Sequence, residues 1–183
     1  MHTVLRSATE DVHERLHLHS GLKAVQDETI DINRYTALIC RLYGFYLPFE
    51  VAAQLIPERT GWLASDLTSL NVNTQKLAAI PICRAFPKFT PQQILGALYV
   101  VEGSALGGRG LARRLDRILG AGVMDGRRFF SGYGADTGVA WREFLTRLTR
   151  AEPRDHPSII DAAKATFETF EEWLNGWDTA IQN

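Results

Sequence analysis

The sequence is poor in cysteine and has no long apolar run. Its only two cysteines, Cys40 and Cys83, lie far apart and lack metal-binding spacing, so we expect reduced, partly buried thiols. No stretch approaches the roughly 18 consecutive apolar residues that a membrane span requires. The first residues also lack the apolar core of a secretory signal. We therefore expect a cytoplasmic protein without a membrane partner.

Net charge is nearly absent too. The 20 Lys and Arg residues almost balance the 21 Asp and Glu residues, which leaves a formal charge of −1. The basic excess that would attract nucleic acid or an anionic membrane is therefore missing. The 183 residues contain no internal repeat or low-complexity tract and suffice to bury a hydrophobic core. We expect one domain over residues 1–183 and no nucleic-acid partner.

Strand-like alternation is missing as well, whereas apolar residues recur at helical spacing throughout, so the predicted fold class is all-α. In the first helix, Thr3 or Ser7 is a candidate cap, and the helix is expected to break at Ser20 and Gly21. A long helix is predicted at 32–55, with a cap at Asp31 and a kink or split at Pro48. Shorter helices are predicted at 62–70 and 73–77, and a further helix runs from Thr90 to Gly120. After an aromatic loop at 129–134, helices are predicted from Asp136 or Thr137 to Arg150 and from His156 to about Ile181.

Three glycines, Gly103, Gly107 and Gly108, lie within residues 102–109 of the helical pattern that begins at Thr90. Each glycine inside a helix costs about 1 kcal/mol relative to alanine. Gly103 and Gly107 are four residues apart and share one face, where they leave the backbone bare. Two explanations stay open, namely close packing of another helix and the approach of a flat ligand. A phosphate-binding loop is poorly supported, because the glycines follow a helix rather than a strand.

His13 is a candidate metal ligand at the edge of the apolar stripe of the first helix, which comprises Leu5, Ala8, Val12 and Leu16. A neutral imidazole there can bind heme iron or another metal, and it can equally be a hydrogen-bonded interfacial histidine. His17, one turn later, offers a zinc pair with His13, but no metalloprotease spacing accompanies the two.

Two motifs in this order resemble the heme oxygenase family, in its bacterial branch. The segment 5–14 is similar to the family's proximal helix, and 99–109 is similar to its glycine-bearing distal helix. The segments 129–145 and 167–173 resemble its third and final segments, so the likeness spans nearly the whole chain. The resemblance implies a single-domain helical fold with heme b between the first helix and the glycine helix.

The resemblance also implies roles for individual residues. It makes His13 the neutral proximal ligand of the iron. It assigns the distal, catalytic side to Gly103, Ser104 and Gly107, and the neighbourhood of the heme propionates to Arg6, Tyr99 and Arg142. Leu16, Gly108 and Phe170 are its remaining heme-binding positions.

Three positions depart from the family pattern. Ser104 stands where well-known members carry an aspartate that organises water around bound oxygen. A serine hydroxyl orders water but supplies no carboxylate. Arg6 replaces a common lysine, keeping the charge and adding a forked donor, and His17 replaces an acidic residue of some members.

The activity implied by the resemblance is the cleavage of heme by O₂ and reducing equivalents to biliverdin, CO and Fe²⁺. The chain has no flavin or nicotinamide fingerprint, so a ferredoxin, a flavodoxin or a flavoprotein reductase is the implied electron donor. A bacterial phytochrome is a candidate acceptor of the biliverdin. Two alternatives remain, a heme-binding or heme-sensing protein that does not degrade heme, and a helical interaction module in which the glycines only pack helices.

Overall fold

The chain folds into helices only, over the residues 1–178 that the computed structural model describes. Its α-helices are α1 (His2–His17), α2 (Ser20–Gln26), α3 (Ile32–Ala52), α4 (Glu58–Ser69), α5 (Thr74–Ala78), α6 (Pro91–Arg114), α7 (Asp116–Leu119), α8 (Arg128–Ser131), α9 (Thr137–Thr149) and α10 (His156–Leu174). Two short 3-10 helices precede α9 and α10, at Gly134–Asp136 and Pro153–Asp155. The prediction of an all-α fold is confirmed.

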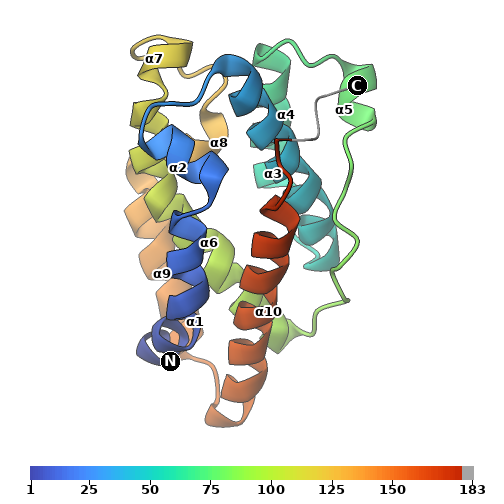
Figure 1. Cartoon of the computed structure of the whole chain (residues 1–183). Coiled ribbons are helices and arrows are strands. Elements are labelled where there is room, and N and C mark those ends of the chain that lie inside the picture. The colour runs from blue at the N-terminus through green and yellow to red at the C-terminus, as the bar shows by residue number, and fades with distance from the viewer. Residues whose placement is uncertain (179–183) are drawn as a thin grey trace.

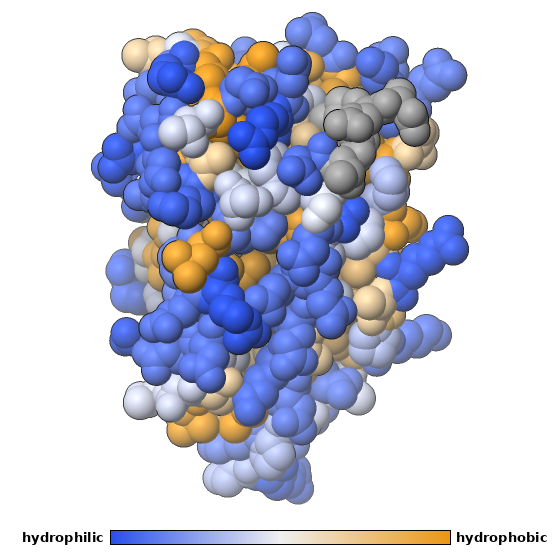
Figure 2. Space-filling model, in the orientation of Figure 1, coloured by the Kyte–Doolittle hydropathy of each residue, from blue (hydrophilic) through white to orange (hydrophobic). Residues whose placement is uncertain are grey.

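Helix α10 is the central packing partner of the bundle. It packs against α6, α1 and α3, and α6 in turn packs against α8 and α9 (Figure 1). In Figure 1, α1 and α10 lie side by side at the front, with α6 and α9 behind α1 and with α3 and α4 on the other side. The face formed by α1 and α10 is predominantly hydrophilic (Figure 2), as expected for amphipathic helices whose apolar stripes face the core.

The strongest predicted helix start is confirmed. The Thr90 hydroxyl accepts from the Gln93 N–H at 3.3 Å, and the Gln93 side chain accepts from the Thr90 N–H at 2.9 Å. This capping box satisfies two amides of the first turn of α6, and Pro91 has no amide to satisfy. Asp31 also caps α3 as predicted, accepting from the Arg34 N–H at 2.9 Å.

The expected kink or split at Pro48 does not end α3, which continues to Ala52. Because proline has no N–H, Pro48 leaves the carbonyl four residues earlier, on Gly44, without its helical donor. The Cys83 N–H donates to that carbonyl at 2.8 Å. The approach requires a glycine, because a Cβ on Gly44 would lie 2.2 Å from the carbonyl oxygen of Pro81. The segment around Pro81 thus repairs the helix that Pro48 interrupts.

Other boundaries differ from the sequence prediction. Helix α1 begins at His2 after Met1, without a side-chain cap, so neither Thr3 nor Ser7 serves as one. The break after the first helix lies at Leu18 and His19, and Ser20 and Gly21 already belong to α2, which the His19 ring caps. Helix α6 ends at Arg114, and a separate short helix, α7, precedes Gly120. The predicted aromatic loop contains α8, and Asp136 makes no side-chain cap bond to α9. Helix α10 ends at Leu174, whereas its predicted end at Ile181 lies outside the described residues.

Gly96 is the contact point of α6 and α10, and its replacement by alanine should destabilise the fold. A Cβ there would lie 2.0 Å from the carbonyl oxygen of Ile159. We expect Gly96→Ala to lower the free energy of unfolding by about 1–3 kcal/mol in urea titrations, since backbone must move to admit the methyl group. Gly110→Ala, on the same helix with no atom within 4 Å, should instead add up to about 1 kcal/mol. Equal stability of the two variants would contradict this packing.

Candidate functional site

Helix α6 contacts the N-terminal part of the chain on either side of the stretch that carries the predicted site, once at the start of α1 and once just after α2. Towards the start of α1, the rings of His2 and Tyr99 lie 6.1 Å apart, and the Tyr99 hydroxyl interacts with Thr9. Beyond the end of α1, Arg114 of α6 pairs with Glu28 at 2.7 Å, just after α2. Along the chain, His13 and the glycines therefore fall between two fixed joints.

The glycine strip, which we define as Gly103, Ser104 and Gly107, is open on its outer side. A Cβ at Gly107 would meet no atom within 4 Å, and one at Gly103 would meet only the ring edge of Trp141, at 3.7 Å. Ser104 and Gly107 are both exposed. The packing explanation therefore loses its support for Gly107, beside which no atom of the described residues lies, whereas Gly103 keeps a contact with Trp141 of α9. A flat ligand fits such a strip.

Gly108 has a different place. It is buried, and a Cβ there would lie 3.0 Å from the carbonyl oxygen of Phe130 in α8. Helix α8 is held in turn by Asp66, which accepts from the N–H groups of Arg128 at 2.7 Å and Phe129 at 2.9 Å. The structure thus gives Gly108 a packing contact behind the strip, whereas the sequence had grouped it with the heme-binding glycines.

His13 presents an exposed ring that favours the neutral form. Burial of part of the ring lowers the pKa of His13 below its usual value, and the nearby His17 and Arg6 lower it further. A neutral imidazole is the form that binds iron. The ring lies edge-on to His17, with 4.5 Å between centroids, and to Phe167 at 6.1 Å. His13 thus has the chemistry of a metal ligand.

The zinc alternative receives no third ligand. Within residues 1–178, no group of three or more His, Cys, Asp or Glu side chains is arranged to hold a metal ion. His13 and His17 are therefore a histidine pair without a completed zinc site in the described part of the chain.

Of the predicted propionate residues, the structure brings Arg6 and Tyr99 together and shows no contact of Arg142 with either of them within the described residues. Burial raises the pKa of Tyr99, and the positive charge of Arg6 opposes this shift; the same charge adds to the lowering of the His13 pKa by burial. The Tyr99 ring lies 5.8 Å from Trp141, whose neighbour Arg142 is exposed. This end of the strip therefore combines the cationic side chain of Arg6 with the aromatic rings of Tyr99 and Trp141, which suits an apolar ring that carries carboxylates.

The structure separates Leu16 and Phe170 from these groups. Leu16 is 7% exposed and belongs to the hydrophobic core. Phe170 is half-buried, and its ring packs 4.7 Å from Phe45 of α3. The aromatic side chain of α10 that contacts the His13 ring is Phe167.

Ser104 is tied to the core by its hydroxyl group. Its Oγ donates to the Val101 carbonyl at 2.9 Å and lies 3.4 Å from the hydroxyl oxygen of Tyr46. Tyr46 belongs to α3 and is buried, and burial raises its pKa. The strip therefore carries a hydroxyl that is oriented by the Val101 carbonyl and lies beside a second hydroxyl from another helix.

Family comparison agrees with this geometry. The sequence model of the heme oxygenase family matches residues 1–176. The chain belongs to the heme oxygenase family. A comparison with curated proteins gives no match. The all-α heme oxygenase fold predicted from the resemblance is confirmed, and membership of the family supports heme as a ligand of the protein. None of the helices within residues 1–178 combines the length and apolar character needed to cross a bilayer.

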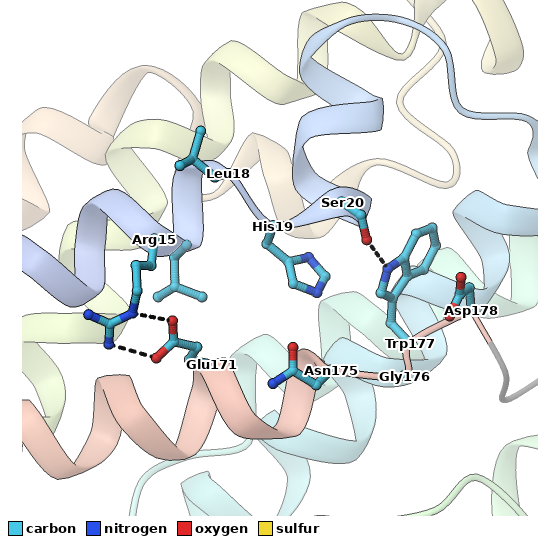
Figure 3. Close-up of a pocket in the computed structure, with 10 residues that line it drawn as sticks. Arg15, Leu18, His19, Ser20, Glu171, Asn175, Gly176, Trp177 and Asp178 are labelled. Atoms are coloured by element: carbon cyan, nitrogen blue, oxygen red, sulfur yellow. Dashed lines mark hydrogen bonds and ion pairs between the residues drawn. The ribbon is translucent and has the colours of Figure 1, made fainter.

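This heme oxygenase family member has a cavity that lies away from the glycine strip. It measures about 250 Å³ and is lined by the α1–α2 corner and the end of α10 (Figure 3). Arg15 and Glu171 form a two-bonded ion pair across it, at 2.6 and 2.8 Å. Its lining does not include His13 or the glycines. Since Arg15 of α1 already pairs with Glu171 of α10 there, we assign this corner to the joint between α1 and α10.

His19 makes that joint sensitive to acid. Its Nδ1 accepts from the Gly21 N–H at 3.3 Å, and its Nε2 lies 3.1 Å from the Leu174 carbonyl oxygen. This pattern requires the neutral ring, because a proton on Nδ1 would face the Gly21 N–H. Burial lowers the pKa of His19, although its bond to Leu174 and the charge of Asp178 oppose the shift.

We therefore expect stability to depend on His19 below neutral pH. The unfolded chain takes up this proton near the ordinary histidine pKa of about 6.5, and the folded chain does so only at lower pH. The free energy of unfolding should fall as the pH drops through that value. His19→Asn keeps a capping side chain but cannot titrate there. In urea titrations the wild type should lose stability relative to this variant between about pH 7 and pH 5, and parallel curves would contradict the role.

Several residues of the site carried no clear signal in the sequence. Trp141 touches Gly103, and Tyr46 contacts Ser104, from helices that are distant along the chain. Both residues fit the apolar pattern of their own helices, so periodicity marks them only as core positions. Their contribution becomes visible once the packing of α3, α6 and α9 is known.

Proposed function

We propose that this protein is a heme oxygenase that cleaves heme to biliverdin, CO and Fe²⁺, using O₂ and external electrons. The observation that carries the proposal is the open strip at Gly103 and Gly107 on α6, a helix that contacts the start of α1, the helix of the neutral His13, through Tyr99. Heme is a flat substrate, and its two faces need an iron ligand on one side and close, uncluttered backbone on the other. Membership of the heme oxygenase family supports this choice of substrate.

In this proposal His13 binds the iron of the substrate, heme b, through its neutral imidazole. The bound heme supplies the iron at which O₂ is activated. A neutral histidine donates less electron density than a thiolate, so it does not strongly favour O–O cleavage towards a ferryl species. Oxygen chemistry is thereby directed at the ring of the substrate. His13 shares its face with Phe167, which restricts rotation of the imidazole.

The distal side holds O₂ by shape and weak hydrogen bonding. Backbone at Gly103 and Gly107 leaves room for the ring, and the Ser104 hydroxyl orders water beside it. No acidic side chain belongs to the strip, because the neighbouring Glu102 is paired with Arg59 at 2.8 Å. Water held by Ser104 then supplies protons without a strong acid against the outer oxygen atom. Arg6, Tyr99 and Arg142 hold the propionate side, which fixes the ring in one orientation.

External partners complete the proposed reaction. Electrons come from a ferredoxin, a flavodoxin or a flavoprotein reductase. The biliverdin serves iron release or passes to an acceptor such as a bacterial phytochrome. We place this activity in the cytoplasm and in a single domain, as proposed from the sequence.

A heme-binding or heme-sensing protein that leaves the heme intact is the second candidate. The observation that favours it is Ser104, whose hydroxyl already has two partners and which stands where well-known family members carry a carboxylate. In this case the strip binds heme and O₂ without the ordered water that ring oxidation requires.

Hemin titration followed by turnover separates these functions. We expect a stoichiometric Soret shift on addition of hemin, then loss of the Soret band and appearance of bile pigment when reductant and O₂ are supplied. Binding without pigment would support the second candidate. Absence of a Soret shift would remove both heme functions and leave a helical interaction module.

A further inference from the structure

One end of the bare face of α6 is closed by an aromatic side chain. Tyr99, Gly103 and Gly107 follow one another at intervals of four residues and share this face. A Cβ at Gly107 would meet no atom of the described residues within 4 Å, whereas one at Gly103 would lie 3.7 Å from Cη2 and 3.8 Å from Cζ3 of Trp141. The bare part of the face therefore ends at the Trp141 ring.

The Trp141 ring is held by aromatic neighbours from three helices. The ring of Phe144, three residues later on α9, stacks on it with 5.5 Å between centroids. Tyr99 of α6 lies 5.8 Å away in a tilted arrangement, and His2 of α1 lies edge-on at 5.8 Å. Phe144 is buried, so the stack rests on the hydrophobic core. With contacts on these sides, the indole has little freedom to turn away from the glycine strip.

The contact at Gly103 is made by the edge of the indole. Both contact atoms belong to the outer edge of its six-membered ring, and their distances are those of ordinary van der Waals contact. Trp141 thus stands beside Gly103 without intruding on its backbone. A flat ligand that lies on Gly107 and extends along α6 towards Tyr99 meets this edge at Gly103.

Such a stop supplies information that the glycines cannot give. Contact between a flat apolar ring and bare backbone is made by dispersion and by the removal of water, and neither depends strongly on how the ring is turned in its own plane. The glycine strip alone therefore lets a ring slide and rotate. A wall on one side removes this freedom, because the ring can approach it with some of its edges and not with others.

We propose that Trp141 is a specificity-determining residue whose indole edge fixes how far a porphyrin extends along α6 and how it is turned on the glycine strip. The inference rests on the proposed function, in which heme lies on the strip with its propionates near Arg6 and Tyr99. In that arrangement the Trp141 edge stops the propionate side of the ring. The position of the ring then decides which of its bridging carbons is cleaved.

Proton NMR of the hemin–cyanide complex measures the position of the ring without turnover, because the order of the heme methyl signals reports its rotation about the bond to His13. In Trp141→Ala we expect a second set of methyl signals, with the ratio of ring positions changed by about twofold to tenfold, the size of one lost aromatic contact. Trp141→Phe keeps a ring for Tyr99 and Phe144 but withdraws the edge from Gly103, so it should show the same change. Methyl signals of wild-type order and ratio in both variants would overturn the proposal.

Pigment analysis and a control variant complete the test. The ratio of biliverdin isomers should change in both Trp141 variants. Trp62→Ala, which removes a half-buried tryptophan of α4 that packs on Tyr133, should leave the isomers and the methyl signals unchanged. The same change in Trp62→Ala would contradict a specific role of Trp141. If the wild type binds hemin but forms no pigment, the proposed function fails, and the methyl signals still decide the role of Trp141; a wild type that binds no hemin would overturn both.

Discussion

Replacing His13 with alanine is expected to abolish the histidine-ligated spectrum of the hemin complex. The neutral ring of His13 is the proposed link to the iron, and loss of even an outer partner of a metal ligand often costs 10–100-fold in affinity. We therefore expect hemin to bind more than about 100-fold more weakly, as measured by absorbance titration. Since the His13 ring is exposed, the free energy of unfolding should change by no more than about 0.5 kcal/mol.

His17→Ala is the matched control for this prediction. The two rings lie 4.5 Å apart on the same helix, so both variants disturb the same surface. The control should keep the spectrum, and added imidazole should restore it in His13→Ala by taking the vacated coordination position. A normal spectrum in His13→Ala would contradict the assignment and point to His17 or His19 as the ligand.

Gly107→Leu is expected to exclude hemin while the fold is kept. No atom lies within 4 Å of a Cβ at Gly107, so leucine fits without moving the backbone and fills the space assigned to the heme. Leucine also favours a helix over glycine by up to about 1 kcal/mol. Circular dichroism should therefore show unchanged or raised thermal stability, and the Soret shift should disappear or turnover should stop.

Gly61→Leu provides the comparison in α4. Its Cβ would likewise meet no atom within 4 Å, and Gly61 is exposed, so the substitution adds the same side chain to another open helix surface. We expect normal hemin binding and turnover in this variant. Normal turnover in Gly107→Leu as well would show that the open strip is not the heme site.

Local sequence patterns predicted the helices whose signals lie within one element. The start of α6 at Thr90 and Pro91 and the cap at Asp31 were both predicted and both are present; the structure adds the capping box between Thr90 and Gln93. Pro48 shows the limit of such reasoning. Its effect on α3 depends on the Cys83 N–H, which a loop delivers from a distant part of the chain.

The candidate site shows the same division. Periodicity placed Gly103 and Gly107 on one face, and the structure leaves that face open. It did not separate Gly108, whose contact with Phe130 depends on how α8 folds back against α6. The Arg59–Glu102 pair joins residues of two different helices that lie far apart in the sequence, and no local sequence pattern connects them.

Carbon monoxide released in a single turnover is the most direct test of the proposed heme cleavage. Hemin is first bound to the protein. An excess of a chemical reductant and O₂ is then added, and CO and pigment are measured in the same sample. We expect one CO for each hemin consumed, with biliverdin as the organic product and with neither product formed by His13→Ala or Gly107→Leu. A stable Soret band without CO, in a wild-type protein that binds hemin stoichiometrically, would contradict the assignment as a heme oxygenase.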